Sequence, residues 1–255
     1  MGNTPSTRFY KYEGTGNDFV ILHESFVDLQ RLTPQMVKWI CDRRFGVGAD
    51  GLIVVHASSG VDYTMLYFNA DGHPGSMCGN GARCAFHYAR KSGLAGPTAR
   101  FQAYDGVHTA RERPDGLIEI SMQDVDEMAI HDDAVVVDTG SPHYVQFVDV
   151  IADVDVLSEG RTIRNRPEFA KEGINVNFVQ VARDRLLLRT YERGVEEVTL
   201  SCGTGATAAA LAYAALRQQA QGPVRIDVLG GSLEVGFTAK DGGGFTRISL
   251  AGPAT

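Results

Sequence analysis

Cys78-Gly79-Asn80-Gly81-Ala82 and Cys202-Gly203-Thr204-Gly205-Ala206 open two stretches of the chain that are rich in small apolar residues. The two runs match at four of their five positions, including the cysteine. A helix that is apolar on all sides is usually a buried helix. We therefore expect helices over residues 79–91 and 203–217, each surrounded by the strands of its own half of the chain.

The two cysteine runs lie about half a chain length apart, and a weaker echo links residues 17–20 to residues 176–179. Repetition at this scale indicates two homologous structural units. We predict an N-terminal half, residues 1–125, that carries Cys78. The C-terminal half, residues 126–255, then carries Cys202.

Most of the remaining chain consists of short runs rich in β-branched and aromatic residues, which favour β-strands. The expected strands are 19–22, 52–55, 61–68, 100–104, 107–112, 117–121, 134–137, 144–148, 175–181, 185–191, 224–228 and 245–250. Thr33-Pro34 is a typical helix start, and Met36, Val37 and Ile40 then share one helical face. The pattern predicts an α+β fold in which each half is a β-barrel-like sheet wrapped around a central helix.

The charge and hydropathy of the chain exclude several classes of protein. A net charge of -7 argues against nucleic acid as a partner, because phosphate binding needs a basic surface. No apolar run approaches the ~18–20 residues of a membrane span, and we see no signal-peptide pattern. Gly2 and Ser6 fit a myristoylation pattern, which we interpret as a short polar tail. The four cysteines lack a disulfide framework spacing, which indicates reduced thiols in a cytoplasm.

The two glycine turns point to a chemistry. A thiol at a helix N-terminus meets unpaired N–H groups and the positive end of the helix dipole, which favour its thiolate. Glycines let the backbone approach a ligand, and the free N–H groups suit a carboxylate. If the halves face each other, a thiolate removes an α-proton from one face while a thiol delivers one to the other. We therefore take Cys78 and Cys202 as catalytic, with no cofactor and no metal, whereas Cys41 and Cys84 are buried packing residues.

Other glycine-rich or cofactor motifs fit less well. Residues 46–51 match G-x-G-x-x-G but follow a helix and precede a strand, the reverse of a dinucleotide site. Residues 203–208 match G-x-G-x-x-A with Asp227 downstream, yet an oxidoreductase leaves the cysteine and its copy at Cys78 unexplained. No lysine lies beside the glycine turns to hold pyridoxal phosphate, and no C-x-x-C or His/Cys cluster indicates zinc.

From Lys11 to its C-terminus the chain resembles the diaminopimelate epimerases of lysine biosynthesis. The matching motifs are Gly-Thr-Gly-Asn-Asp-Phe at 14–19, Phe-Asn-Ala-Asp-Gly at 68–72, Cys-Gly-Asn-Gly-Ala-Arg-Cys at 78–84, Tyr-Glu-Arg-Gly at 191–194 and Cys-Gly-Thr-Gly at 202–205. The resemblance implies two pseudo-symmetric domains and a cofactor-independent isomerase that interconverts LL- and meso-diaminopimelate. It implies Cys78 and Cys202 as the acid/base pair, and a homodimer as the common assembly.

The same resemblance implies the substrate-binding residues. The reacting amine and carboxylate meet the Asn17 side chain, Glu192, and the backbone of Gly79, Asn80, Gly203 and Thr204. The distal end of the substrate meets Asn69, Asn175, Glu192 and Arg193. Arginine can hold a carboxylate with two hydrogen bonds, and glutamate can pair an ammonium group. Ser141 and His143 are candidate supporting residues behind this set.

Two departures from the family pattern matter. Ser141 stands where the family usually has asparagine, and serine reaches less far. Substrate identity therefore stays open between diaminopimelate and the proline, hydroxyproline or histidine of related two-base epimerases. A non-catalytic or redox protein is the alternative from another class. The family chain also usually extends a few residues beyond 252–255, so we expect a shortened last strand.

Overall fold

The computed structural model describes residues 8–131 and 133–255, so Gly2 and Ser6 lie outside the described residues. The chain forms two compact units. Unit 1 comprises the chain up to residue 118 together with residues 254–255, and unit 2 comprises residues 119–253. The units therefore part a few residues before the division after residue 125 that the repeat predicts, and the last two residues return to unit 1.

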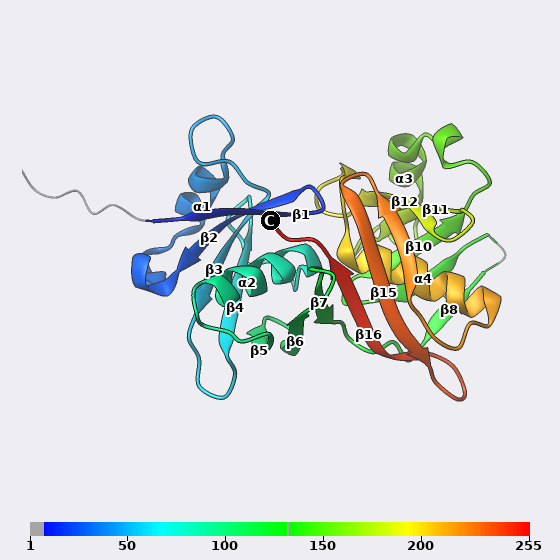
Figure 1. The fold of residues 1–255 in the computed structure, drawn as a ribbon. Helices are drawn as coiled ribbons and strands as arrows, with labels where there is room; N and C mark the ends of the chain where they lie inside the picture. Colours follow the sequence, from blue (N-terminus) through cyan, green and yellow to red (C-terminus); the bar gives the residue numbers. More distant parts are fainter. Residues whose placement is uncertain (1–7, 132) are drawn as a thin grey trace, which may run out of the picture. The chain divides into compact units, whose positions relative to one another are not determined.

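The described residues of unit 1 form strands β1 to β6 and two α-helices (Figure 1). Its elements are β1 (Tyr10–Gly14), β2 (Asn17–His23), η1 (Glu24–Phe26), η2 (Leu29–Arg31), α1 (Pro34–Cys41), β3 (Gly51–His56), β4 (Tyr63–Asn69), α2 (Gly79–Lys91), β5 (Thr98–Ala103) and β6 (Gly106–Glu112). The strands lie in the sheet in chain order. Helix α2 contacts β1, β2, β3, β4 and β6, so the sheet wraps around it and its apolar side chains form the core.

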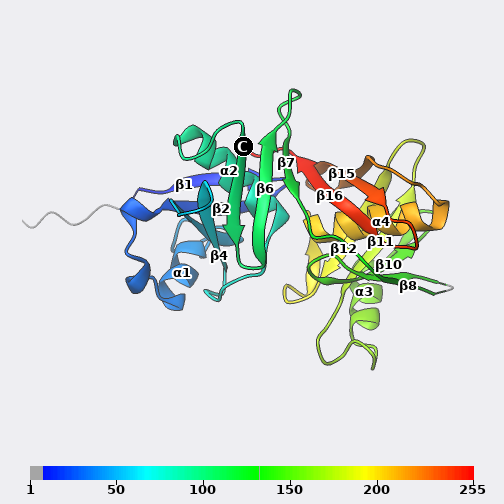
Figure 2. The ribbon, with the colours of Figure 1, turned by 90° about the horizontal axis from the view of Figure 1, so that it is seen from below.

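Unit 2 repeats this plan on a larger scale (Figure 2). Its elements are β7 (Ile118–Ser121, which begins at the boundary), β8 (Met128–Ile130), β9 (Val135–Asp138), β10 (Pro142–Phe147), η3 (Ile151–Asp153), α3 (Val156–Arg164), β11 (Asn175–Val181), β12 (Leu186–Glu192), β13 (Glu197–Thr199), α4 (Gly203–Arg217), β14 (Val224–Val228), β15 (Gly231–Ala239) and β16 (Phe245–Gly252). Helix α4 contacts β9, β10, β11, β12, β14, β15 and β16, and ten of its residues are buried.

The strand pairings of the two units follow one pattern. In unit 1 the pairs from β1 to β6 alternate between antiparallel and parallel. The series β9, β10, β11, β12, β14 and β15 alternates in the same way. Helix α2 lies between β4 and β5 along the chain, and α4 lies between β12 and β14. The two cysteine-led helices therefore occupy equivalent places in equivalent sheets.

The predicted equivalence of residues 17–20 and residues 176–179 is wrong, because the two segments lie on strands that are not counterparts. Residues 17–20 lie on β2, whereas residues 176–179 lie on β11, which is the counterpart of β3. The parallel register pairs Phe19 with Gly51 in unit 1 and His143 with Asn175 in unit 2. The true counterpart of the Asn175 segment is therefore the Gly51 segment. The shared Asn and Phe-Val letters are a chance recurrence of residues that suit buried strands.

The predicted α+β class, with sheets wrapped around central helices, is confirmed. Helices α2 and α4 have the predicted bounds, because the Cys-Gly turns mark their starts locally. None of the described helices is both long and apolar enough to span a membrane. Sequence reasoning missed α3, whose first turn is capped by Asp155 through a 3.2 Å hydrogen bond from Ser158 N. The last strand, β16, spans eight residues.

Candidate active site

Cys78 is the N-cap residue of α2. Its backbone is extended, and its Sγ accepts a 3.5 Å hydrogen bond from the backbone N–H of Gly81. The thiol is half-buried, while Gly79 and Asn80 behind it are buried. The sulfur thus lies at the positive, N-terminal end of a helix, where a thiolate or a bound carboxylate is stabilised.

Asn17 reaches Cys78 from the hairpin between β1 and β2. The two-residue turn, Thr15 and Gly16, has positive φ at both positions, as the tight primed hairpin turns require. Asn17 Oδ1 accepts hydrogen bonds from Cys78 Sγ at 3.7 Å and from Asn80 Nδ2 at 3.3 Å. Three of the predicted substrate-binding or catalytic side chains are therefore in direct contact.

Asn69 lies at the same edge of the unit 1 sheet. It is the last residue of β4 and pairs with Gly51, the first residue of β3. Gly51 in turn pairs with Phe19, near the start of β2. The strand ends therefore bring Asn69 to the edge that carries Asn17.

Cys202 is the N-cap residue of α4 and is 8% exposed. Its Sγ lies 3.5 Å from Thr204 Oγ1, and Gly205 follows in the first turn. A Cβ atom on Gly205 would stand 2.6 Å from Asn177 Oδ1 on β11, so only glycine fits against this strand. A Cβ atom on the equivalent Gly81 would stand 3.1 Å from the Cδ1 atom of Ile53 on β3.

Ser141, Asn175 and Arg193 form a hydrogen-bonded cluster in unit 2. Asn175 Nδ2 donates to Ser141 Oγ at 3.0 Å, and Arg193 Nη2 donates to the same oxygen at 3.2 Å. Asn175 Oδ1 accepts from the backbone N–H of Arg193 at 2.9 Å. Glu192 precedes Arg193 at the end of β12. Two of the residues predicted for distal recognition, Asn175 and Arg193, therefore lie together, with Ser141 as their common acceptor.

His143 is completely buried on β10. Asn177 Nδ2 donates to its Nδ1 at 3.0 Å, so the ring proton lies on Nε2, a buried atom that has no hydrogen-bond partner among the described residues. Burial, and secondly the charge of Arg193, lower the His143 pKa to about 3. The imidazole is therefore neutral near pH 7.

The other two cysteines differ from the predicted catalytic pair. Burial raises the pKa of Cys41 to about 11 and that of Cys84 to about 12. Both thiols are protonated near neutral pH, as expected of packing residues. The described residues hold no group of three or more His, Cys, Asp or Glu side chains that could bind a metal ion.

Sequence reasoning missed three polar residues that contact the unit 1 site. Asp50 Oδ2 accepts a 2.8 Å hydrogen bond from Asn17 Nδ2, and Arg43 Nη2 donates to Asp50 Oδ1 at 2.7 Å. Arg83 Nη2 donates to Asn80 Oδ1 at 3.0 Å. Asp50 lies within the G-x-G-x-x-G match of residues 46–51, a pattern that is typical of a dinucleotide site and gives no sign of a carboxylate partner for Asn17. Arg83 could have been predicted, because an arginine within a helix expected to be buried needs a polar partner.

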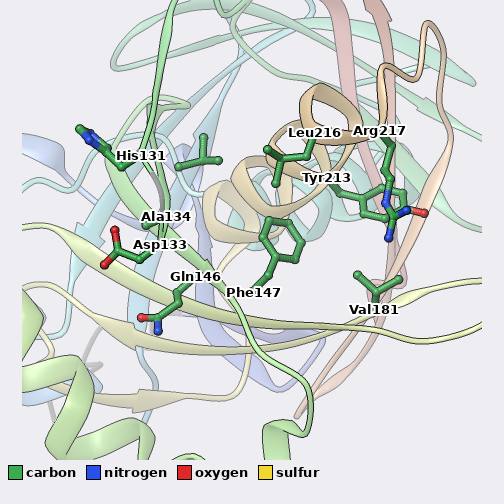
Figure 3. Close-up of a pocket in the computed structure, with 10 residues that line it drawn as sticks. His131, Asp133, Ala134, Gln146, Phe147, Val181, Tyr213, Leu216 and Arg217 are labelled. Atoms are coloured by element: carbon green, nitrogen blue, oxygen red, sulfur yellow. The ribbon is translucent and has the colours of Figure 1, made fainter.

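A cavity of about 510 Å³ in unit 2 is separate from these groups (Figure 3). It lies around the last turn of α4, the end opposite Cys202, where Tyr213, Leu216 and Arg217 face Phe147 and Val181. None of the predicted site residues lines it, so it is not part of the candidate active site.

Comparison with known sequences gives the family. A profile of diaminopimelate epimerase matches residues 9–132 and 135–254. The diaminopimelate epimerase of Flavobacterium psychrophilum is 43% identical over 97% of this chain and 96% of its own length. That of Chlorobaculum tepidum is 40% identical over 94% of this chain and 95% of its own. The chain belongs to the diaminopimelate epimerase family.

Solved structures extend the likeness beyond the diaminopimelate epimerase family, at the level of the fold. A phenazine biosynthesis protein of the PhzF family from Bacillus anthracis aligns with a TM-score of 0.75 over 97% of this chain and 95% of its own, at 14% identity. A hydroxyproline epimerase from Agrobacterium vitis, solved with trans-4-hydroxy-L-proline, aligns at 0.69 over 100% and 92%, also at 14% identity. These structures confirm the fold.

Proposed function

We propose that the chain is an isomerase that interconverts LL- and meso-diaminopimelate in lysine biosynthesis, by proton transfer between Cys78 and Cys202. One thiolate removes the α-proton from one face of the carbon. The thiol of the other cysteine delivers a different proton to the opposite face. Because both cysteines act on one carbon in this proposal, two thiolates would repel each other, and we expect one thiolate and one thiol at rest.

The observation that carries this proposal is the equivalence of the two cysteines. Each is the N-cap of the buried central helix of its unit, and each helix stands at the same point in the same order of strands. Epimerisation needs matched groups on two faces of one carbon, which a duplicated unit supplies. Membership of the diaminopimelate epimerase family supports the same conclusion.

The helix ends supply the remaining chemistry. In our proposal the backbone N–H groups of Gly79, Asn80, Gly203 and Thr204 bind the reacting carboxylate and stabilise the charge that moves onto it. Asn17 and Glu192 bind the amine. Arg193, with Asn175, Asn69 and Ser141, receives the distal end. No cofactor is required, and we expect full activity after exhaustive chelation and no pyridoxal or flavin absorbance.

Hydrogen exchange during turnover tests the two-base mechanism. When one stereoisomer reacts in D2O, early product should carry deuterium at the inverted carbon while recovered substrate stays mostly protiated. The donor thiol has exchanged with solvent, whereas the abstracted proton stays on the base until release. Return of the original proton to product would contradict the mechanism.

Cysteine variants identify the two bases. Cys78→Ala and Cys202→Ala should each nearly abolish inversion, because each removes one half of a pair that acts as a unit. Cys41→Ala is the matched control, since this thiol is buried on α1 and should leave turnover close to wild type. Substantial inversion by either of the first two variants would exclude the assignment.

Because Ser141 departs from the family pattern, proline, hydroxyproline and histidine are a second candidate class of substrates. Its hydroxyl replaces an amide that the resemblance predicts, and it binds the Arg193 and Asn175 side chains. A panel of these amino acids with diaminopimelate separates the two proposals. We expect turnover of diaminopimelate alone, by a cytoplasmic homodimer with no nucleic-acid or membrane partner.

A further inference from the structure

The side-chain amide of Asn17 is held from both ends. Its Nδ2 donates to Asp50 Oδ2 at 2.8 Å. Its Oδ1 accepts from Asn80 Nδ2 at 3.3 Å and from the Cys78 thiol at 3.7 Å. An amide has one donor face and one acceptor face, so these contacts decide which face meets the sulfur.

Asp50 and Arg83 stand at the two ends of this series of hydrogen bonds, and neither can exchange donor for acceptor. Asp50 is a carboxylate, which only accepts, and Arg43 Nη2 holds its other oxygen at 2.7 Å. Arg83 is a guanidinium, which only donates, and its Nη2 lies 3.0 Å from Asn80 Oδ1. With a fixed acceptor at one end and a fixed donor at the other, both amides have a single consistent orientation.

Arg83 also fixes the hairpin that carries Asn17. Its Nη2 donates to Thr15 Oγ1 at 3.2 Å, and Thr15 has a φ of 52°, which is unfavourable for a β-branched residue. The Arg83 side chain is completely buried. Burial lowers its pKa to about 10, so it keeps its charge at neutral pH.

The backbone around Asp50 explains the G-x-G-x-x-G match of residues 46–51. A Cβ atom on Gly46 would stand 2.0 Å from Trp39 O, and Gly48 has a φ of +81°. Both glycines let the chain turn closely back on the end of α1. Asp50 then lies beside β2, where its Oδ2 also accepts from the backbone N–H of Asp18 at 3.1 Å. The motif thus shapes a turn that presents a carboxylate to Asn17.

We propose that Asp50 is a positioning residue that holds the Asn17 amide with its oxygen toward Cys78, while Arg83 fixes the same direction through Asn80. The inference deepens the proposed function and rests on it for the catalytic role of Cys78. A carbonyl oxygen facing the sulfur accepts from the thiol and disfavours the thiolate. The reversed amide would present an N–H and favour the thiolate. Asp50 therefore favours the thiol form of Cys78 over its thiolate.

Other charged groups of unit 1 also act on this thiol. Arg83 interacts electrostatically with Cys78, Cys84 and Glu13. Asp18 shares Arg43 with Asp50, through a 2.7 Å contact to Arg43 Nη2, but forms no hydrogen bond with Asn17 among the described contacts. Asp18 Oδ1 also accepts from the backbone N–H of Asp50 at 3.1 Å. Asp18→Asn is a matched control, because it removes a neighbouring negative charge but keeps an oxygen that can accept this hydrogen bond, which leaves the acceptor of Asn17 in place.

The test measures the pH dependence of Cys78 alkylation by iodoacetamide, followed by peptide mass spectrometry. The background is Cys202→Ser, so that a second thiol does not titrate with Cys78. Asp50→Ala should lower the apparent pKa of Cys78 by about one pH unit, since the amide is free to turn. Asp50→Asn, which keeps an acceptor, should shift it less, and Asp18→Asn should shift it least. Equal shifts for Asp50→Ala and Asp18→Asn would overturn the proposal, because loss of charge alone would explain both.

A double-mutant cycle with Asn17→Ala decides whether Asp50 acts through Asn17. In the Asn17→Ala background, Asp50→Ala should leave the alkylation profile almost unchanged. The same one-unit shift with and without Asn17 would mean that Asp50 acts on Cys78 directly. Alkylation needs no substrate, so this result stands even if the protein turns over no diaminopimelate. In the active enzyme, Asp50→Ala should lower kcat/KM about ten-fold.

Discussion

Arg193 and Ser141 are joined by a 3.2 Å hydrogen bond, in which Nη2 of the guanidinium donates to the serine hydroxyl oxygen. Nη1 of the same guanidinium donates to the backbone carbonyl of Glu172 at 2.9 Å. Both ends of the fork are thus directed by neutral oxygens, which a carboxylate outcompetes because a hydrogen bond between charged groups is roughly twice as strong. In our proposal the distal carboxylate of the substrate takes these two donors over from Ser141 and Glu172.

Arg193→Ala should therefore weaken the use of diaminopimelate. Loss of a charge-assisted partner from a desolvated site typically costs about 2–5 kcal/mol in transition-state stabilisation. The measurement is kcat/KM from initial rates. Arg225→Ala, at a residue 66% exposed on β14, is the control and should behave like wild type. An unchanged kcat/KM for Arg193→Ala would contradict the role of Arg193 in binding a distal carboxylate and would favour substrates that lack one.

Ser141→Ala should act mainly on substrate binding. The change removes the shared acceptor of Asn175 Nδ2 and Arg193 Nη2, and leaving such donors unsatisfied costs about 1–3 kcal/mol. We expect KM to rise several-fold while kcat changes little. Ser158→Ala, at an exposed position on α3, is the comparison. A fall in kcat at constant KM would place Ser141 in the chemical step instead.

Local signals made α2 and α4 predictable, whereas long-range packing hid other elements. The Cys-Gly-polar-Gly turns mark both helix starts without any tertiary context. Strand β15 was missed because Gly231 and Gly236 interrupt its apolar pattern, and the ladders to β14 and β16 supply its order. Helix α3 is largely polar, and Gly160 packs closely against Tyr191, a contact that no local pattern reveals.

The candidate site divides in the same way. Cys78, Gly79 and Asn80 were predictable because they adjoin in the sequence and share one helix end. The contact of Asn17 with Asp50 joins residues 33 positions apart, and that of Arg83 with Thr15 joins residues 68 positions apart. Such pairs depend on strand order and register. Short motifs encode these weakly, because the similarity of residues 17–20 to residues 176–179 predicted the wrong pair of equivalent strands.

The two equivalent glycines should respond differently to alanine. A Cβ on Gly205 meets Asn177 Oδ1 at 2.6 Å, and that oxygen is held by a 2.9 Å hydrogen bond from Thr190 Oγ1. A Cβ on Gly81 would stand 3.1 Å from the terminal methyl of Ile53, which can move, and 3.5 Å from Met65 and Phe19, which is an ordinary contact distance. Gly205→Ala should destabilise the protein by about 1–3 kcal/mol, the usual cost of overpacking.

Gly81→Ala provides the internal control for this asymmetry. Alanine favours a helix over glycine by about 1 kcal/mol, which offsets the small shift of Ile53. Thermal unfolding of both variants, measured at one scan rate, checks the difference. Equal losses of stability would show that the Asn177 amide yields to the added methyl group and that its hydrogen bonds do not hold it.

The last prediction concerns stability in alkaline solution. Burial raises the pKa of Cys84 from 9.0 to about 12 in the folded protein, with the charge of Arg83 opposing the shift. Between these two values the unfolded chain releases the thiol proton while the folded chain retains it. Stability from this group is therefore intact below pH 9 and falls as pH rises above it. At pH 10 the loss is about 1.4 kcal/mol, because one pH unit corresponds to that free energy.

Cys84→Ala removes this contribution, so its free energy of unfolding should fall less between pH 8 and pH 10 than that of the wild type. The quantity compared is the change in the free energy of unfolding from pH 8 to pH 10. The packing cost of the substitution is the same at both pH values and cancels. Ala85→Gly, at the next buried position of α2, has a comparable packing and helix cost but keeps the thiol. Its pH dependence should follow the wild type. If urea unfolding gives all three proteins the same loss from pH 8 to pH 10, Cys84 ionises no more reluctantly in the folded protein than in the unfolded chain. The Arg83 guanidinium beside it would then compensate fully for its burial.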